Sequence, residues 1–128
     1  GVGRVLVMDD DQRIRKLTGR YLQKLGYRFD LARHGEDAIK KFDMALKDQM
    51  PYDAVILDLT VRGGMGGEET IKKLLKIDPS AKVIVASGHA NNLIMAHHAD
   101  FGFSGALSKP YKIQSLGNIL NRVLSEDD

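Results

Sequence analysis

Acidic, hydroxyl and basic residues follow several short apolar runs of this 128-residue sequence, each at the point where a run ends. Three consecutive aspartates, residues 9–11, follow the first run, and Asp58 follows a later one. Ser87 follows a third apolar run, and Lys109 follows a fourth. A buried strand that runs into a carboxylate is costly unless something pairs with the charge. These positions are therefore the first candidates for a chemical site.

Carboxylates that a fold brings together repel one another and need a cation. The sequence has no cysteine, so thiolate metal sites are excluded, and its four histidines show no metal-binding pattern. Ligands that offer only oxygen favour a hard ion, and Mg²⁺ takes one or two carboxylates together with water and phosphate oxygens. We therefore expect the carboxylates at these strand ends to form a site for Mg²⁺, and Asp11 to cap the helix that follows it.

The same residue types suit phosphoryl transfer. A carboxylate can act as a nucleophile and become an aspartyl phosphate. Mg²⁺ and the ammonium of Lys109 would neutralise the oxygens of the transferred group, and the hydroxyl of Ser87 would add a hydrogen bond. Asp58 is the candidate nucleophile because its strand is expected between the acidic pair and Lys109.

Short apolar runs alternate with amphipathic segments along the whole chain. Helices are expected over residues 12–25, 36–47, 68–77, 91–101 and 113–124, and strands over 5–8, 27–32, 54–57, 82–86 and 103–108. This alternation predicts an α/β fold with a parallel sheet and helices on both faces. The three most apolar strands should be central and the strand over 27–32 should lie at an edge, while the helix over 91–101 has a poor apolar stripe.

The order of these elements also predicts where the site lies. In open parallel sheets, ligands bind beyond the carboxyl ends of the strands, at the point where the strand order reverses. The candidate residues all stand at such ends, so we expect them to meet at one rim.

Composition indicates one globular domain over residues 1–128, with 43% hydrophobic and 28% charged residues. No apolar run approaches the roughly 20 residues that a membrane span needs. The net charge is only +2 and the basic residues form no block in the sequence, so nucleic acid is not an expected partner, and no membrane contact by this domain is expected. The absence of cysteine fits a cytoplasmic location, which is expected. Because the chain opens on glycine and not methionine, we expect it to have been excised from a larger protein.

Four segments resemble, in order and spacing, the signatures of response-regulator receiver domains of two-component signalling: residues 5–11, 55–59, 86–88 and 108–110. The resemblance covers almost the whole chain. It implies a flavodoxin-like sheet with the strand order 2-1-3-4-5.

The resemblance also implies a role for each candidate residue. Asp9, Asp10 and Asp58 would hold Mg²⁺ together with the backbone carbonyl of Thr60, and Asp58 would accept the phosphoryl group. Ser87 would be the switch hydroxyl. Lys109 would bind the phosphate, next to a peptide bond to Pro110 that is often cis in this family.

By the same resemblance the chain is a phosphorelay receiver. It would take a phosphoryl group from the phosphodonor domain of a histidine kinase and could pass it to a histidine phosphotransfer protein. It would not be an enzyme, since it catalyses only its own phosphorylation and dephosphorylation. Residues 59–61, 63–67, 102–105 and 109–111 resemble the C-terminal receivers of hybrid sensor histidine kinases; a stand-alone response regulator is the alternative.

Two positions depart from the family pattern. Many receivers carry an aromatic residue three positions before the lysine, and this chain has Ala106 there. Arg62 stands where a proline commonly follows the phosphoacceptor strand.

The expected readout surface is the rim formed by residues 91–101, the last strand and the last helix. Thr60 and His89 occupy positions that tune water access to the phosphoryl group in this family.

Two other functions share part of this pattern. A phosphatase of the haloacid dehalogenase type also uses Mg²⁺ and an aspartyl phosphate, but it needs a second aspartate two residues after the nucleophile, where this chain has Thr60. An inert interaction module of the same fold is disfavoured because all the chemical residues are present.

Overall fold

A five-stranded parallel sheet forms the centre of the molecule, as the computed structural model shows for residues 2–89 and 92–125. The strands lie in the order β2-β1-β3-β4-β5, which confirms the predicted order. Their bounds are β1 (Arg4–Met8), β2 (Arg28–Ala32), β3 (Ala54–Asp58), β4 (Val83–Ser87) and β5 (Gly105–Ser108). The three most apolar strands, β1, β3 and β4, are central, and β2 lies at an edge, as expected.

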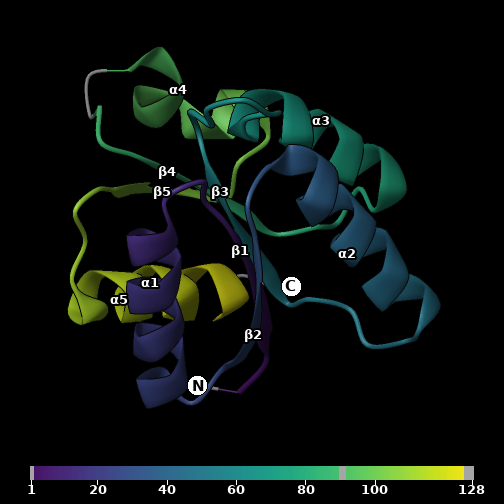
Figure 1. Cartoon of the computed structure of the whole chain (residues 1–128), viewed down its shortest axis with the longest axis horizontal. Coiled ribbons are helices and arrows are strands. Elements are labelled where there is room, and N and C mark those ends of the chain that lie inside the picture. The colour runs from purple at the N-terminus through teal and green to yellow at the C-terminus, as the bar shows by residue number, and fades with distance from the viewer. Residues whose placement is uncertain (1, 90–91, 126–128) are drawn as a thin grey trace.

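Helices cover both faces of the sheet (Figure 1). Helices α1 and α5 pack together on one face, and α2 and α3 pack together on the other. The bounds are α1 (Gln12–Leu25), α2 (Gly35–Lys47), α3 (Gly67–Ile77), α4 (Leu93–Ala96), the 3₁₀ helix η1 (His98–Phe101) and α5 (Ile113–Ser125). No helix in residues 2–89 or 92–125 combines the length and the apolar character that crossing a bilayer requires.

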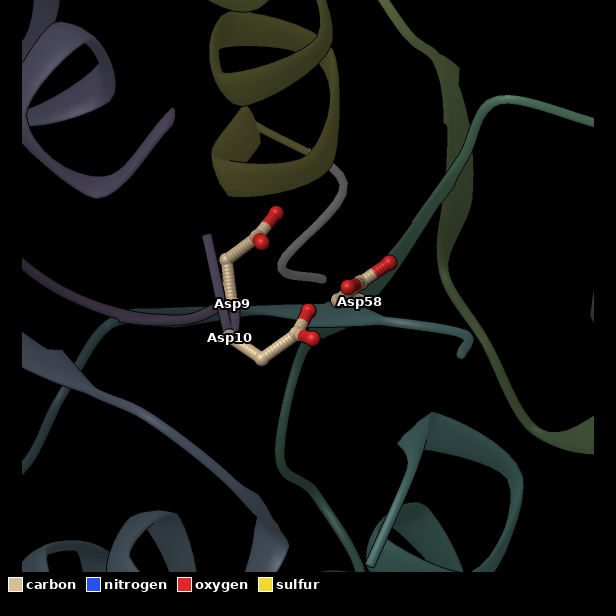
Figure 2. Close-up of side chains that lie close together, drawn as sticks. All are labelled: Asp9, Asp10 and Asp58. Carbon is tan, nitrogen blue, oxygen red and sulfur yellow. The ribbon is translucent and has the colours of Figure 1, made fainter. Parts of the chain in front are cut away.

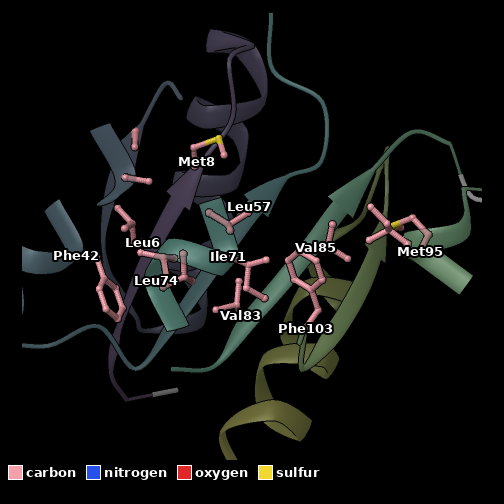
Figure 3. Packing of buried hydrophobic residues seen from close by; sticks show 14 residues of the cluster. Leu6, Met8, Phe42, Leu57, Ile71, Leu74, Val83, Val85, Met95 and Phe103 are labelled. Atoms are coloured by element: carbon pink, nitrogen blue, oxygen red, sulfur yellow. The ribbon is translucent and has the colours of Figure 1, made fainter. Parts of the chain in front are cut away.

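The sheet separates the core into two layers. Alternate residues of each central strand point to opposite faces, because side chains alternate along a strand. Leu6, Leu57 and Val85 pack against α2, α3 and α4 (Figure 3). Val7 and Ile56 pack against α1 and α5 on the other face. Burial on both faces holds the carboxyl ends of the central strands in fixed positions, and the candidate residues stand at these ends.

Helix α1 begins and ends at specific residues. The side chain of Asp11 accepts a hydrogen bond from the backbone N–H of Arg13, which confirms the predicted N-cap. Gly26 ends the helix with a φ of 91°, a left-handed conformation that favours glycine.

The predicted helix over residues 91–101 is wrong in its extent. The chain forms the short helix α4, leaves helical geometry at His97 (φ −122°, ψ 43°) and then forms η1. Only Ile94 and Met95 are buried in this segment, and Leu93 is 65% exposed, so little packing favours a continuous helix. Asn91, where the prediction began, lies outside the described residues.

A close backbone contact beside β3 makes Gly66 sensitive to substitution. A Cβ atom added at Gly66 would lie 2.6 Å from the backbone carbonyl oxygen of Leu59, so the backbone would have to shift. We expect Gly66→Ala to lower the free energy of unfolding by about 1–3 kcal/mol. The control is Gly88→Ala, because a Cβ at Gly88 meets nothing within 4 Å. Urea unfolding of both variants checks this, and equal stabilities would contradict it.

Candidate functional site

The candidate residues meet at the carboxyl edge of the sheet, as the sequence predicts. Asp58 is the last residue of β3, and Ser87 is the last residue of β4. Asp9 directly follows β1, and Lys109 directly follows β5. The parallel register places these ends side by side, because β3 lies between β1 and β4, and β5 lies next to β4.

Three carboxylates converge at this edge. Asp9, Asp10 and Asp58 each offer an oxygen, and these oxygens all lie within 4.8 Å of one another (Figure 2). Asp9 and Asp58 are buried, and Asp10 is half-buried with one oxygen 3.2 Å from the backbone N–H of Arg62. The donor set is hard oxygen at close quarters, which fits Mg²⁺. Asp11 takes no part in this cluster because its side chain caps α1.

Lys109 joins two of the carboxylates. Its Nζ lies 2.7 Å from Asp9 Oδ2 and 2.9 Å from Asp58 Oδ1, and its side chain is 15% exposed. Burial by itself lowers the pKa of the Lys109 ammonium, but the hydrogen bonds and charges of Asp9 and Asp58 outweigh burial and raise this pKa. The lysine is therefore a fixed positive charge at the nucleophile. The bond from Lys109 to Pro110 is cis, as the resemblance implies.

Asp58 is held in an environment that disfavours its charge. The pKa of this carboxyl is raised to about 6: burial is the largest cause, the hydrogen bond from Lys109 opposes it, and the nearby charge of Asp9 adds to the rise. A bound cation would stabilise the charged form of a carboxyl in this environment. The cluster is thus built to take up positive charge, from a metal ion or from a proton.

This raised pKa predicts a pH dependence of stability in metal-free buffer. The unfolded chain releases the Asp58 proton near pH 4, so between that pH and about 6 the folded protein binds more protons than the unfolded chain. The contribution of Asp58 to the free energy of unfolding should therefore increase as pH falls from 7 to 5. Urea unfolding in EDTA at both pH values should show a gain that Asp58→Asn removes; an identical pH dependence in the variant would contradict the assignment.

A cavity of about 430 Å³ opens above the carboxylates. Its wall includes Thr60, Ser87 and His89 as well as the three carboxylates and Lys109. The Oγ of Ser87 accepts a hydrogen bond from the backbone N–H of His89 at 3.0 Å. Thr60 and His89 are exposed at this rim. The carbonyl of Thr60 as a metal ligand stays a prediction.

Two contacts that position the site were not predicted. The guanidinium of Arg15 donates a hydrogen bond to the backbone carbonyl of Asp9 at 2.7 Å and so braces the acidic turn. The hydroxyls of Thr18 and Tyr111 lie 2.6 Å apart in the interior and tie α1 to the segment after Lys109. The Thr18–Tyr111 contact joins residues 93 positions apart, and the Arg15–Asp9 contact depends on how the chain turns between β1 and α1, so the sequence pattern indicates neither.

Ala106 lies on β5 and packs, half-buried, against the core layer of α2 and α3. The nearest aromatic residues before and after β5 in the sequence are Phe103 and Tyr111, and both are buried. Phe103 lies in the same layer as Ala106, and Tyr111 lies in the layer of α1 and α5. No aromatic side chain therefore takes the place of Ala106 on β5 itself.

A parallel sheet in this order, with an acidic cluster and a lysine at its carboxyl edge, defines the class of receiver domains. Residues 5–121 match the family model of the response regulator receiver domain. The chain belongs to this family.

Individual relatives agree with this membership. The chain is 31% identical over 121 residues to the chemotaxis protein CheY of Thermotoga maritima, covering 94% of this chain and 96% of that protein. It is 26% identical over 121 residues to the sporulation initiation phosphotransferase F of Bacillus subtilis, covering 94% and 93%. Other relatives are longer: the chain covers 24% of a putative NtrX-like response regulator of Rickettsia felis.

Solved structures share the fold. The CheY-like receiver domain protein of Methanospirillum hungatei superposes with a TM-score of 0.85 at 23% identity, covering 99% of this chain and 97% of the other. Chemotaxis protein CheY4 of Vibrio cholerae superposes with a TM-score of 0.84 at 26% identity, covering 97% and 100%.

Family membership establishes the general activity. Receiver domains of two-component signalling take phosphoryl groups from histidine kinases or phosphotransfer proteins, and they bind Mg²⁺ at an acidic pocket. The chain is therefore a receiver domain of two-component signalling.

Proposed function

We propose that Asp58 accepts a phosphoryl group from a phosphohistidine on a histidine kinase domain. The observation that carries this assignment is the placement of its carboxylate at the end of the central strand. Asp9 and Asp10 lie on one side of it, Ser87 ends the strand on the other side, and the Nζ of Lys109 is 2.9 Å away.

The chemistry is a transfer from nitrogen to oxygen. A carboxylate oxygen of Asp58 attacks phosphorus, the N–P bond breaks, its electron pair returns to the imidazole, and an acyl phosphate remains on the protein. Asp9, Asp10, Asp58 itself and the carbonyl of Thr60 would hold Mg²⁺, which when bound neutralises charge on the phosphoryl oxygens. Lys109, already directed at Asp58, would pair with a second phosphoryl oxygen.

The new charge would then reorganise the neighbouring loop. A phosphoryl group adds about −1.5 to −2 charges, and the hydroxyl of Ser87 lies in the same cavity wall. Moving Ser87 would pull on the segment that leads to α4. We propose that partners read the state at the rim of α4, β5 and α5, where α4 is only four residues long and held by two buried side chains. With Ala106 on β5, this route does not use an aromatic rotation at that position.

The phosphodonor would dock beside the cavity. A groove of about 420 Å³ runs between α1 and the segment after β5, and its wall includes Ile14, Leu17, Gly88 and Tyr111. Leu17 is 42% exposed and contributes apolar surface to this groove. Lys109 belongs to this wall and to the phosphorylation cavity, so a protein in the groove reaches Asp58.

We further propose that residues 1–128 are the receiver of a hybrid histidine kinase and act on the cytoplasmic side. The glycine-rich loop over 63–67 and the segment over 109–111 support this origin. A stand-alone response regulator is the second candidate, since the relative from Thermotoga maritima is matched over almost its whole length. Sequencing the coding region on both sides distinguishes them, because a hybrid kinase needs a kinase core in frame.

Phosphotransfer from a panel of autophosphorylated histidine kinase cores tests the proposed function. At least one core should label the wild-type chain with radioactive phosphate in Mg²⁺, and none should label Asp58→Asn. The domain should turn over only its own acyl phosphate and should not hydrolyse a small phosphomonoester. Normal labelling of Asp58→Asn, or no labelling of the wild type by any core or by acetyl phosphate, would contradict the proposal.

A further inference from the structure

Helix α1 differs from the other charged helices in the sign of its charges. It carries five basic residues and no aspartate or glutamate within Gln12–Leu25. In α2, by contrast, acidic and basic residues alternate and form ion pairs such as Lys47 with Asp43 at 2.9 Å. Helix α3 likewise has acidic residues at its start and lysines further along. The net charge of only +2 is therefore unevenly distributed over the surface.

Three of the α1 cations form a row, which we call the basic row: Lys16, Arg20 and Lys24. They are spaced four residues apart, so they lie on one side of the helix, and all three are exposed. Within residues 2–89 and 92–125, no carboxylate forms an ion pair with any of them. Like charges at this spacing destabilise a helix, so the row opposes folding of α1 and gains nothing from a neighbour.

Within Ile113–Ser125, the neighbouring helix adds no negative charge beside the row. Helix α5, which packs beside α1 (Figure 1), contains Arg122 and no acidic residue within Ile113–Ser125. The helical layer of α1 and α5 is thus basic, whereas the layer of α2 and α3 is mixed.

The basic row leads directly to the site. Arg13, one turn before Lys16, lines the phosphorylation cavity, and its guanidinium pairs with Asp11 at 3.5 Å. Leu17, next to Lys16, lines the apolar groove beside that cavity. From Lys16 to Lys24 the row extends about 12 Å along the helix, because each residue rises about 1.5 Å. A partner that fills the groove therefore lies against the row.

We propose that the basic row binds carboxylates on the protein that donates the phosphoryl group to Asp58. The inference rests on the proposed function and names the chemistry of its partner. The partner surface is a helix with an apolar side chain for the groove and acidic residues spaced four apart opposite the row. The groove with Leu17 favours a protein over a nucleic acid, since a phosphate backbone offers nothing to an apolar groove. Rim charges of this kind act mainly on the association rate and make it depend on salt.

The test compares two triple variants that remove the same number of positive charges. One is Lys16→Gln/Arg20→Gln/Lys24→Gln on α1. The other is Lys72→Gln/Lys73→Gln/Lys76→Gln on α3, at the far face of the sheet. The probes are histidine kinase cores and phosphotransfer proteins chosen so that their docking helices range from acidic to basic. Acetyl phosphate serves as a donor that needs no docking surface.

The expected result has three parts. Acetyl phosphate labels both variants within about twofold of the wild type. Transfer from acidic-faced donors is fastest, and it slows at least tenfold between low and high salt in the wild type and in the α3 variant. The α1 variant loses at least tenfold in kcat/KM at low salt and shows little salt dependence.

Other outcomes would overturn the inference. Acidic-faced donors that transfer no faster than basic-faced ones, or an α1 variant that behaves like the α3 variant, would show that the row does not select the donor. Row-dependent binding of a labelled duplex DNA more tightly than any donor protein would assign the row to nucleic acid. If acetyl phosphate labels Asp58 in these cases, only this inference fails; if nothing labels Asp58, the proposed function fails as well.

Discussion

Replacing Asp10 with asparagine is expected to abolish Mg²⁺-dependent phosphorylation of the domain. The substitution keeps the shape of the side chain and removes one of three charges whose oxygens lie within 4.8 Å of one another. Mg²⁺ relies on charged oxygen ligands, and the loss of even an indirect partner costs about 10–100-fold in metal affinity, so losing a direct ligand should cost more than about 100-fold. Titration calorimetry with Mg²⁺ and labelling with acetyl phosphate check the two effects separately.

A neighbouring aspartate supplies the matched control for Asp10. Asp11 is next in the chain, but its carboxylate caps α1 by accepting from the N–H of Arg13. Asparagine caps a helix about as well as aspartate does, so Asp11→Asn should leave Mg²⁺ binding, phosphorylation and stability close to those of the wild type. Equal losses in the two variants would place the metal elsewhere.

Replacing Lys109 with methionine should greatly lower both the stability of the metal-free protein and the rate of its phosphorylation. The Nζ of Lys109 lies between two buried carboxylates at 2.7 and 2.9 Å, so its removal leaves Asp9 and Asp58 without their cation. Breaking such a buried pair costs about 3–5 kcal/mol of stability in metal-free buffer. Mg²⁺ should restore more stability in this variant than in the wild type, because the ion would supply the missing charge.

Phosphorylation of Lys109→Met should nevertheless remain slow when Mg²⁺ is saturating. A preorganised cation at a developing negative charge contributes about 10²–10³ in rate, and the metal cannot also take the place of the ammonium. Lys112→Met is the control, since Lys112 lies exposed three residues further on. Stopped-flow labelling and urea unfolding, each with and without Mg²⁺, measure both effects. Wild-type labelling rates in Lys109→Met would contradict the role assigned to this lysine.

The fold could be predicted from the sequence because its signals are local and repeated. The apolar runs that become β1, β3 and β4 are buried on both faces, and such strands read as continuous hydrophobic segments. The sequence also marks both ends of helix α1, with Asp11 as its N-cap and Gly26 as its C-cap. The prediction of one helix over 91–101 was wrong because only two side chains among the described residues 92–101 are buried, so packing does not support a long helix.

The sequence predicts those residues of the candidate site that stand at the ends of strands. The convergence of Asp9, Asp10 and Asp58 follows from the rule that the carboxyl ends of parallel strands meet at one edge. The hydrogen bond between Thr18 and Tyr111 could not be predicted, since it joins positions 93 residues apart whose types are common in a core. The raised pKa of Asp58 results from burial and the nearby charge of Asp9, against the hydrogen bond from Lys109, so its prediction also requires the three-dimensional structure.

Locating the phosphoryl group on the protein tests the central claim most directly. The wild-type chain would be phosphorylated by a histidine kinase core in Mg²⁺, reduced with borohydride, which converts an acyl phosphate to an alcohol, and digested for tandem mass spectrometry. We expect the reduced residue at Asp58, as homoserine, and unmodified aspartate at Asp9, Asp10 and Asp11. Reduction at one of those three residues, or a phosphoryl group on a histidine with Asp58 intact, would contradict the assignment.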